Sequence, residues 1–417
     1  MSKESLKPGW KMIKFGDIVR QCKEKVDRDD NPFERYVEGG HMDSENIHIR
    51  RWGEFGADYV GPAFHRIFRK GQVLYGSRRT YLKKVAIADF DGITANTTFV
   101  CETKDQNVFM QELLPFLMLT DSFTEHSIRE SKGSTNPYIN WPDIAKYEFP
   151  LPPLDEQKRI AEILWAADEA MEEYTTAKSQ LIRLKEVSEI EFFNDSLGAS
   201  VSHKSKNIYS VDGWVIDVGE ELLKKNYIYK IQDGNHGGQY PRSHEFSEHG
   251  LNYLSANNIS DDGVIDFDSC PKLPVERANK LRIKPAIGGD VILTHNATVG
   301  RVTVIPDDYD EVVLSTSTTY YRLNPELVDR DYFVGYLRSH YFQRQLHRVM
   351  KQSTRDQVPI TAQKKLLFII PPLDKQIEFS KLVSSFQDRL QFLDDHISNA
   401  KSLHKTILNK SLRSTYV

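Results

Sequence analysis

The chain has 417 residues, of which 39% are hydrophobic and 27% are charged. This length is enough for two to four domains with cores of their own, and the composition is typical of a globular protein. The formal net charge of −4 excludes a histone-like or tail-type nucleic-acid binder. Any binding to DNA must therefore depend on local basic surface.

The cysteines indicate the compartment. Cys22, Cys101 and Cys270 are far apart and odd in number, which is typical of a reducing environment and gives neither a disulfide framework nor a zinc site. No apolar N-terminal region or long apolar run is present, which argues against secretion and membrane spanning. We expect a cytoplasmic protein that holds no metal.

Residues 1–150 are rich in Gly, Asn, Tyr and β-branched residues, which predicts a mixed, β-rich domain. Basic and aromatic side chains alternate between residues 64 and 84. Basic side chains neutralise phosphates, and Arg can hold a guanine edge with two hydrogen bonds. An ordinary solvated basic surface is the alternative. The candidate DNA-binding residues here are Arg66, Arg69, Lys70, Arg78, Arg79, Tyr81 and Lys83.

A polar loop precedes the end of this domain and supplies four more candidates. Short polar side chains beside a cation suit base edges and phosphate oxygens, although a turn packed against its own helix would look the same. The residues are Lys132, Ser134, Thr135 and Asn136.

The sequence Pro152-Pro153-Leu154-Asp155-Glu156-Gln157 has the chemistry of a helix start. Proline is tolerated in a first helical turn, and an aspartate there lies near the positive end of the helix dipole. Apolar residues then recur at steps of three and four, with no internal Pro or Gly. The pattern predicts a long helix over 151–198.

Residues 199–369 have the composition of the first domain and predict a second one. A Gly-rich loop begins at Asp233 and could bring backbone close to phosphate or form a tight structural turn. A second loop follows the strand-like run that ends at Leu293, and a third precedes the next helix. The candidates are Asn235, His236, Arg242, His295, Asn296, Arg301, Lys351, Ser353, Thr354 and Arg355.

The proline motif recurs as Pro371-Pro372-Leu373-Asp374-Lys375-Gln376, 371 − 152 = 219 residues later. Apolar residues at alternating steps of four and three predict a coiled-coil helix over 370–417. Because one chain supplies two such helices, we expect them to pair with each other as an antiparallel coiled coil. A second copy or another protein is the alternative partner.

The repeated order is domain, helix, domain, helix, and other landmarks follow it. Gly71-Gln72-Val73-Leu74-Tyr75 matches Gly289-Asp290-Val291-Ile292-Leu293, and Ser134-Thr135 matches Ser353-Thr354. The duplicated order predicts an α+β protein with two mixed α/β, β-rich domains, two long joining helices and an internal pseudo-twofold repeat.

With these landmarks the chain resembles the DNA-specificity subunit of type I restriction-modification systems. The resemblance implies that each domain is a target-recognition domain reading one half of a bipartite site on double-stranded DNA. It implies that the helices set the gap between the half-sites and dock two methyltransferase subunits. A motor-nuclease subunit would join this complex. In that family the specificity subunit carries no catalysis.

One pattern imitates a catalytic site. Pro142-Asp143 with Glu156-Gln157-Lys158 resembles a nuclease carboxylate set, but Glu156 and Lys158 fall in a first helical turn and the second copy lacks them. No Gly-Lys-Ser/Thr phosphate loop or Gly-rich cofactor loop is present. We expect no enzyme activity and no cofactor. The alternative function is a scaffold that binds proteins instead of DNA.

Overall fold

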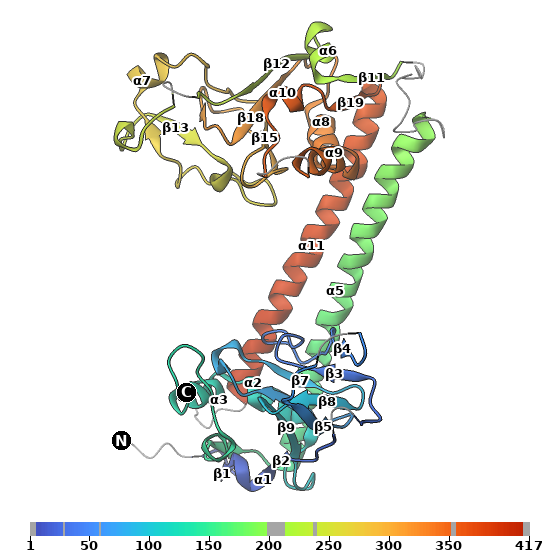
Figure 1. Cartoon of the computed structure of the whole chain (residues 1–417), viewed down its shortest axis with the longest axis vertical. Helices are drawn as coiled ribbons and strands as arrows, with labels where there is room; N and C mark the ends of the chain where they lie inside the picture. The colour runs from blue at the N-terminus through green and yellow to red at the C-terminus, as the bar shows by residue number, and fades with distance from the viewer. Residues whose placement is uncertain are drawn as a thin grey trace. The chain divides into compact units, whose positions relative to one another are not determined.

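The computed structural model describes residues 6–27, 30–57, 60–197, 213–236, 240–351 and 356–411. The chain forms two compact units, one of residues 1–176 with 394–417 and one of residues 177–393. Each unit holds one mixed domain and parts of two long helices, α5 (Leu154–Leu197) and α11 (Leu373–Ser411), drawn in green and red in Figure 1.

The domain of the first unit is built on two four-stranded sheets. In one sheet every neighbouring pair is antiparallel, and in the other β3 and β8 run parallel. The first has the order β2 (Val19–Cys22), β9 (Thr98–Thr103), β6 (Val73–Gly76) and β7 (Val85–Ile87). The second has the order β4 (Gly53–Glu54), β3 (Arg35–Val37), β8 (Gly92–Ala95) and β5 (Phe64–Phe68). A separate antiparallel pair joins β1 (Lys11–Lys14) to β10 (Glu148–Leu151).

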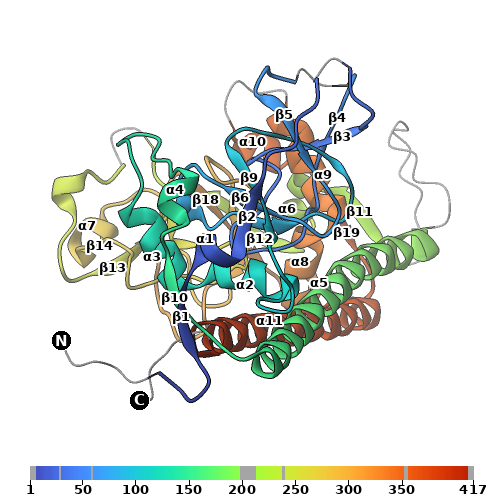
Figure 2. The ribbon, with the colours of Figure 1, turned by 90° about the horizontal axis from the view of Figure 1, so that it is seen from below.

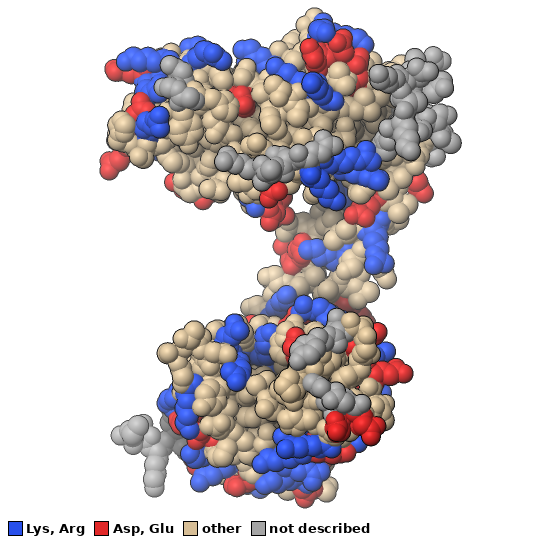
Figure 3. All heavy atoms as spheres, in the orientation of Figure 1, with Lys and Arg blue, Asp and Glu red and all other residues tan. Residues whose placement is uncertain are grey.

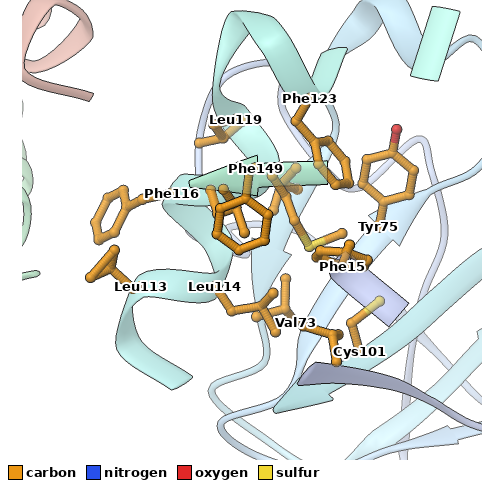
Figure 4. Close-up of a cluster of buried hydrophobic side chains, with 14 of the residues drawn as sticks. Phe15, Val73, Tyr75, Cys101, Leu113, Leu114, Phe116, Leu119, Phe123 and Phe149 are labelled. Carbon is orange, nitrogen blue, oxygen red and sulfur yellow. The ribbon is translucent and has the colours of Figure 1, made fainter. Parts of the chain in front are cut away.

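Short helices cover the first sheet and form the core with it. Phe15, Tyr75 and Phe123 meet there at ring-centroid distances of 5.2 and 5.8 Å. Figure 4 shows Phe116 pointing away from this cluster, and its ring contacts Trp165 of α5 and His404 of α11. The helices are α1 (Phe15–Ile18), α2 (Leu114–Leu119), α3 (Asp121–Arg129) and α4 (Trp141–Ile144), with 3-10 turns at Thr80–Leu82 and Gln111–Leu113.

The second unit repeats this plan. Its larger sheet has the order β12 (Ile228–Asp233), β18 (Thr318–Leu323), β15 (Val291–Thr294) and β16 (Val302–Val304). Its smaller sheet has the order β14 (Lys272–Leu273), β13 (Leu251–Leu254) and β17 (Val313–Leu314). Again one pair of the smaller sheet, β13 with β17, is parallel, and β11 (Val215–Val218) pairs with β19 (Leu367–Ile370). The α+β class and the internal repeat predicted from sequence are confirmed.

Helices of the second unit follow the succession of the first, with α7 as an addition that has no counterpart among the described residues of the first unit. They are α6 (Gly219–Lys224), α7 (Val275–Asn279), α8 (Arg330–Arg338), α9 (His340–Met350) and α10 (Ile360–Gln363), with 3-10 turns at Ser243–Glu245 and Ala256–Asn258. No helix among the described residues has the length and apolar content needed to cross a membrane.

The long helices run antiparallel within each unit, as Figure 2 also shows. In the first unit Tyr174 contacts His396, with ring centroids 5.4 Å apart, and further toward the start of α5 Asp168 lies beside His404 in one cavity. In the second unit the ring centroid of Phe192 lies 4.8 Å from that of Phe379, which is near the start of α11. The expected intramolecular pairing of the two helices is therefore confirmed.

The glutamine of each Pro-Pro-Leu-x-x-Gln motif fixes the helix to its domain. Gln157 is 1% exposed; its Oε1 accepts from Met110 N, and its Nε2 donates to Val108 O and Pro152 O. Gln376 is fully buried and makes the same three bonds in the second unit, with Asp329 N, Leu327 O and Pro371 O. Both amides are satisfied at each end, so the motif is a structural joint.

The second proline of each motif meets a glycine at the other end of its domain. Gly9 has φ +81°, and a Cβ there would lie 3.0 Å from Cγ of Pro153. Gly213 has φ +79° and the same 3.0 Å approach to Pro372. The positive φ and the close contact both require glycine, which explains the glycine of Gly9-Trp10 and of Gly213-Trp214 near the start of each domain.

We predict that Gln157→Ala destabilises the first unit by about 2–4 kcal/mol, because it leaves the Met110 N–H and two carbonyls without their partner. Gln376→Ala should do the same to the second unit. The exposed helix residues Gln180 and Gln387 serve as controls, and their alanine variants should unfold like the parent. Urea unfolding measures the difference, and equal stability of all four variants would contradict the joint.

Candidate nucleic-acid interface

Two loops predicted separately as DNA-contacting lie side by side in the first unit. β6 ends at Gly76, and the chain then pairs briefly with the segment before α4. Ile139 N donates to Ser77 O at 2.9 Å, and Arg79 N donates to Pro137 O at 2.7 Å. Between these two bonds Arg78 lies directly opposite Tyr138. The Arg78–Arg79 loop and the 132–138 loop are thus one surface.

The second unit builds the same junction after β15. Val358 N donates to His295 O at 2.8 Å, and Ala297 N donates to Asp356 O at 3.1 Å. Between them Asn296 lies opposite Gln357. The equivalence extends to the backbone, because Arg79 and Ala297 both have positive φ, +48° and +65°.

This geometry agrees with the sequence match between the preceding strands. The match of Gly71–Tyr75 against Gly289–Leu293 continues to Ser77 against His295 and Arg78 against Asn296, and the hydrogen bonds give the same correspondence. Tyr138 and Gln357 were not among the sequence candidates. Their separation, 357 − 138 = 219, equals that of the two proline motifs and was the signal that could have found them.

Several candidates are exposed and free to reach a ligand. Tyr81 is 52% exposed. Figure 3 shows Lys and Arg gathered in local clusters on the visible face, with acidic residues between them. The other exposed candidates are Lys70, Arg78, Arg79, Ser134, Thr135, Asn136, Arg242 and Lys351.

Four candidate cations form ion pairs with carboxylates of their own domain. Lys83 is largely buried, 2.7 Å from Asp121 and 3.0 Å from Glu45. Arg69 pairs with Glu24 at 2.8 Å and with Asp91 at 3.2 Å, Lys132 with Asp143 at 3.0 Å, and Arg301 with Asp261 at 2.5 Å. Their charge is partly compensated, so they contribute less to the attraction of phosphate than the exposed arginines do.

Three other candidates have different surroundings. Asn235 is buried, and its amide both donates to Ile283 O at 3.0 Å and accepts from Ile283 N at 2.8 Å. His236 is exposed and lies 2.8 Å from Asp233. Burial lowers the pKa of Arg66, whose Nη1 has no hydrogen-bond partner among the described residues.

His295 forms the base of the second junction. It is buried, and its Nδ1 lies 2.9 Å from Oγ1 of Thr319. Burial lowers the pKa of His295 to about 4, so its ring is neutral near pH 7. Its backbone carbonyl accepts the hydrogen bond from Val358. Three further candidates, Ser353, Thr354 and Arg355, lie outside the described residues.

The family model of the type I restriction modification DNA specificity domain matches the chain twice, at residues 8–184 and 220–402. The chain belongs to this family. Each match contains one domain and the start of the helix that follows it, which agrees with the repeat seen in the structure. The chain is therefore a DNA-specificity subunit of the type I restriction-modification class.

Named relatives agree with this assignment. The type I restriction enzyme MjaVIII specificity subunit of Methanocaldococcus jannaschii is 24% identical over 76% of this chain and 73% of its own length. The EcoDI specificity subunit of Escherichia coli is 25% identical over 49% of this chain and 46% of its own length.

Two solved structures share the fold over nearly the whole chain. One comes from a study of complex assembly and conformational transition of the type I R-M system, with a TM-score of 0.60, 19% identity, and coverage of 99% of this chain and 100% of that one. The other is the S subunit of a type I system from M. genitalium, with a TM-score of 0.56, 15% identity, and coverage of 100% of this chain and 98% of that one.

We predict that the second unit loses stability as the pH falls from 6.5 to 4. The unfolded chain takes up a proton at the ordinary histidine pKa, whereas folded His295 resists it until about pH 4. At pH 5 the cost is about 2 kcal/mol. Urea unfolding at pH 7.5 and at pH 5 measures this loss. Between the two pH values, the free energy of unfolding should fall less in His295→Gln than in the parent.

The exposed His249→Gln variant is the control and should keep the parental pH dependence. An identical pH dependence in the parent and His295→Gln would show that His295 does not set this loss.

Proposed function

We propose that this chain is the sequence-reading subunit of a type I restriction-modification complex and recognises a bipartite site on double-stranded DNA. The first target-recognition domain, residues 1–150, reads one half-site, and the second, residues 199–369, reads the other. The helices over 151–198 and 370–417 set the gap between the half-sites. Catalysis belongs to other subunits, and the chain itself uses no cofactor.

The observation that carries this proposal is the duplicated junction in a chain of the DNA-specificity family. Each unit presents a polar loop pair after the corresponding strand, β6 or β15, on the same hydrogen-bonded frame. The backbone hydrogen bonds are the same in both units, and the exposed side chains on them differ. This arrangement suits two domains that recognise different DNA sequences. Although the net charge of the chain is −4, the exposed Arg78 and Arg79 give this surface local positive charge.

The long helices are the proposed docking surface for two methyltransferase subunits, with a motor-nuclease subunit completing the complex. Exposed apolar side chains lie along both helices, although both helices also contribute other residues to the cores of the two units. Such side chains on a helix surface suit contact with a partner. They are Ile163, Ile182, Leu184, Val187, Ile377, Phe392 and Leu403.

Co-expression with type I methyltransferase subunits, followed by mapping of methylated adenines across the host genome, tests this function. We expect methylation at one bipartite motif that is absent without the chain. Purified complex should bind that site with an affinity that falls steeply as salt rises, because counterions leave the phosphates. Binding to proteins alone, with no methylated motif and no salt-dependent DNA binding, would instead support a scaffold.

Lengthening both helices by seven residues tests their role in spacing. Copies of residues 170–176 and 387–393, inserted after Thr176 and Leu393, keep the heptad pattern and add about 10 Å at 1.5 Å per residue. At 3.4 Å per base pair the recognised gap should grow by about three base pairs, with both half-sites unchanged. An unchanged gap at full methylation would show that the helices serve docking only.

A further inference from the structure

The junction in each unit is a short antiparallel bridge with a defined geometry. In the first unit the bonds Ile139 N to Ser77 O and Arg79 N to Pro137 O flank the Arg78–Tyr138 pair. A pair flanked in this way is the non-hydrogen-bonded kind, in which the two Cα atoms lie closest and both side chains project to one face. Arg78 and Tyr138 therefore form one two-residue platform.

The preceding pair fixes which way that platform faces. Ser77 and Ile139 are both buried, at 5% and 1% exposure, and successive residues of a strand point to opposite faces. Arg78 and Tyr138 consequently face outward, and both are exposed. The platform has a fixed base inside the domain and a free outer side.

The second unit places Asn296 and Gln357 on the corresponding platform. His295 and Val358 are the buried pair beneath it, at 4% and 0% exposure, and Asn296 and Gln357 are partly exposed. The flanking bonds, His295 O with Val358 N and Ala297 N with Asp356 O, repeat those of the first unit. The frame is the same in both units, and the side chains on it are different.

Those side chains belong to two different chemistries of base recognition. The guanidinium of Arg donates two parallel hydrogen bonds to O6 and N7 of guanine. The amides of Asn and Gln donate to N7 and accept from N6 of adenine, and an amide cannot serve guanine in the same way. Neither platform carries a carboxylate, which would repel the phosphates and would suit cytosine.

We propose that these two platforms are specificity-determining positions, with Arg78 and Tyr138 reading a guanine in one half-site and Asn296 and Gln357 reading an adenine in the other. This assignment rests on the proposed function, because it requires each unit to face DNA. It separates Arg78 from its neighbour Arg79, which lies beyond the platform in a left-handed conformation. Arg79 is then a candidate for phosphate contact.

The test compares methylation maps of the parent and of variants co-expressed with the same methyltransferase subunits. Arg78→Gln should relax one guanine in one half-site by about 5- to 100-fold in discrimination and leave the other half-site unchanged. Arg78→Lys keeps the charge and can still donate to O6 and N7 of guanine but lacks the planar fork, so it should retain most of the affinity and only part of the discrimination. Asn296→Ala and Gln357→Ala should relax adenine in the other half-site.

Arg20→Gln is the matched control, because Arg20 is an exposed arginine on β2, at the far side of the same sheet. Asn279→Ala, at the end of α7, is the control for the amides. Both should methylate the parental motif. Thermal melting of each purified variant separates a folding defect from a change in reading, and the outward position of the four platform residues predicts parental melting.

The outcomes separate this inference from the function beneath it. If the parent gives no bipartite motif, the proposed function fails. If the parent gives one but Arg78→Gln weakens all sequences alike and relaxes no guanine, Arg78 contacts phosphate and the platform assignment is overturned. Absence of guanine from one parental half-site, or of adenine from the other, overturns it as well.

Discussion

Each domain depends on one buried glutamine for its connection to the helix that leaves it. Gln157 and Gln376 place an amide where a strand ends and a helix begins, and each satisfies one backbone N–H and two carbonyls. A buried amide with all three partners in place cannot shift without leaving polar groups unpaired. The start of α5 or α11 is therefore fixed on the domain that precedes it, and the glycine–proline contacts hold the opposite end of each domain to the same point.

The two copies have kept this frame and diverged where the frame is exposed. The strand order of one four-stranded sheet, a parallel pair in the other sheet and the bridge after β6 or β15 are common to both units. What differs is the side chain carried on the bridge, Arg78 in one unit and Asn296 in the other. Backbone hydrogen bonds are indifferent to an outward side chain, so this side chain can change without cost to the fold.

Charge is arranged locally, in agreement with a net charge of −4. Lys83, Arg69 and Arg301 hold loops together through carboxylates, whereas Arg78 and Arg79 lie exposed at the junction. A cation with a carboxylate at 2.7 Å has most of its field cancelled at a distance, and an exposed one attracts phosphate. The number of basic residues in a segment is thus a poor measure of its affinity for DNA. The affinity depends on whether those residues are already paired with carboxylates.

The sequence by itself determined the repeat, the two long helices and their antiparallel pairing, because proline, glutamine and heptad patterns act over neighbouring residues. It also located the loops around Arg78 and Asn296. Only the tertiary structure decided which loop residues share a face: Arg78 meets Tyr138 through a bridge between segments 60 residues apart, and no local pattern encodes that register. Burial likewise separated Lys83 and His295, which support the loops from inside, from Arg78, because whether a polar side chain faces inward depends on contacts made by distant parts of the chain.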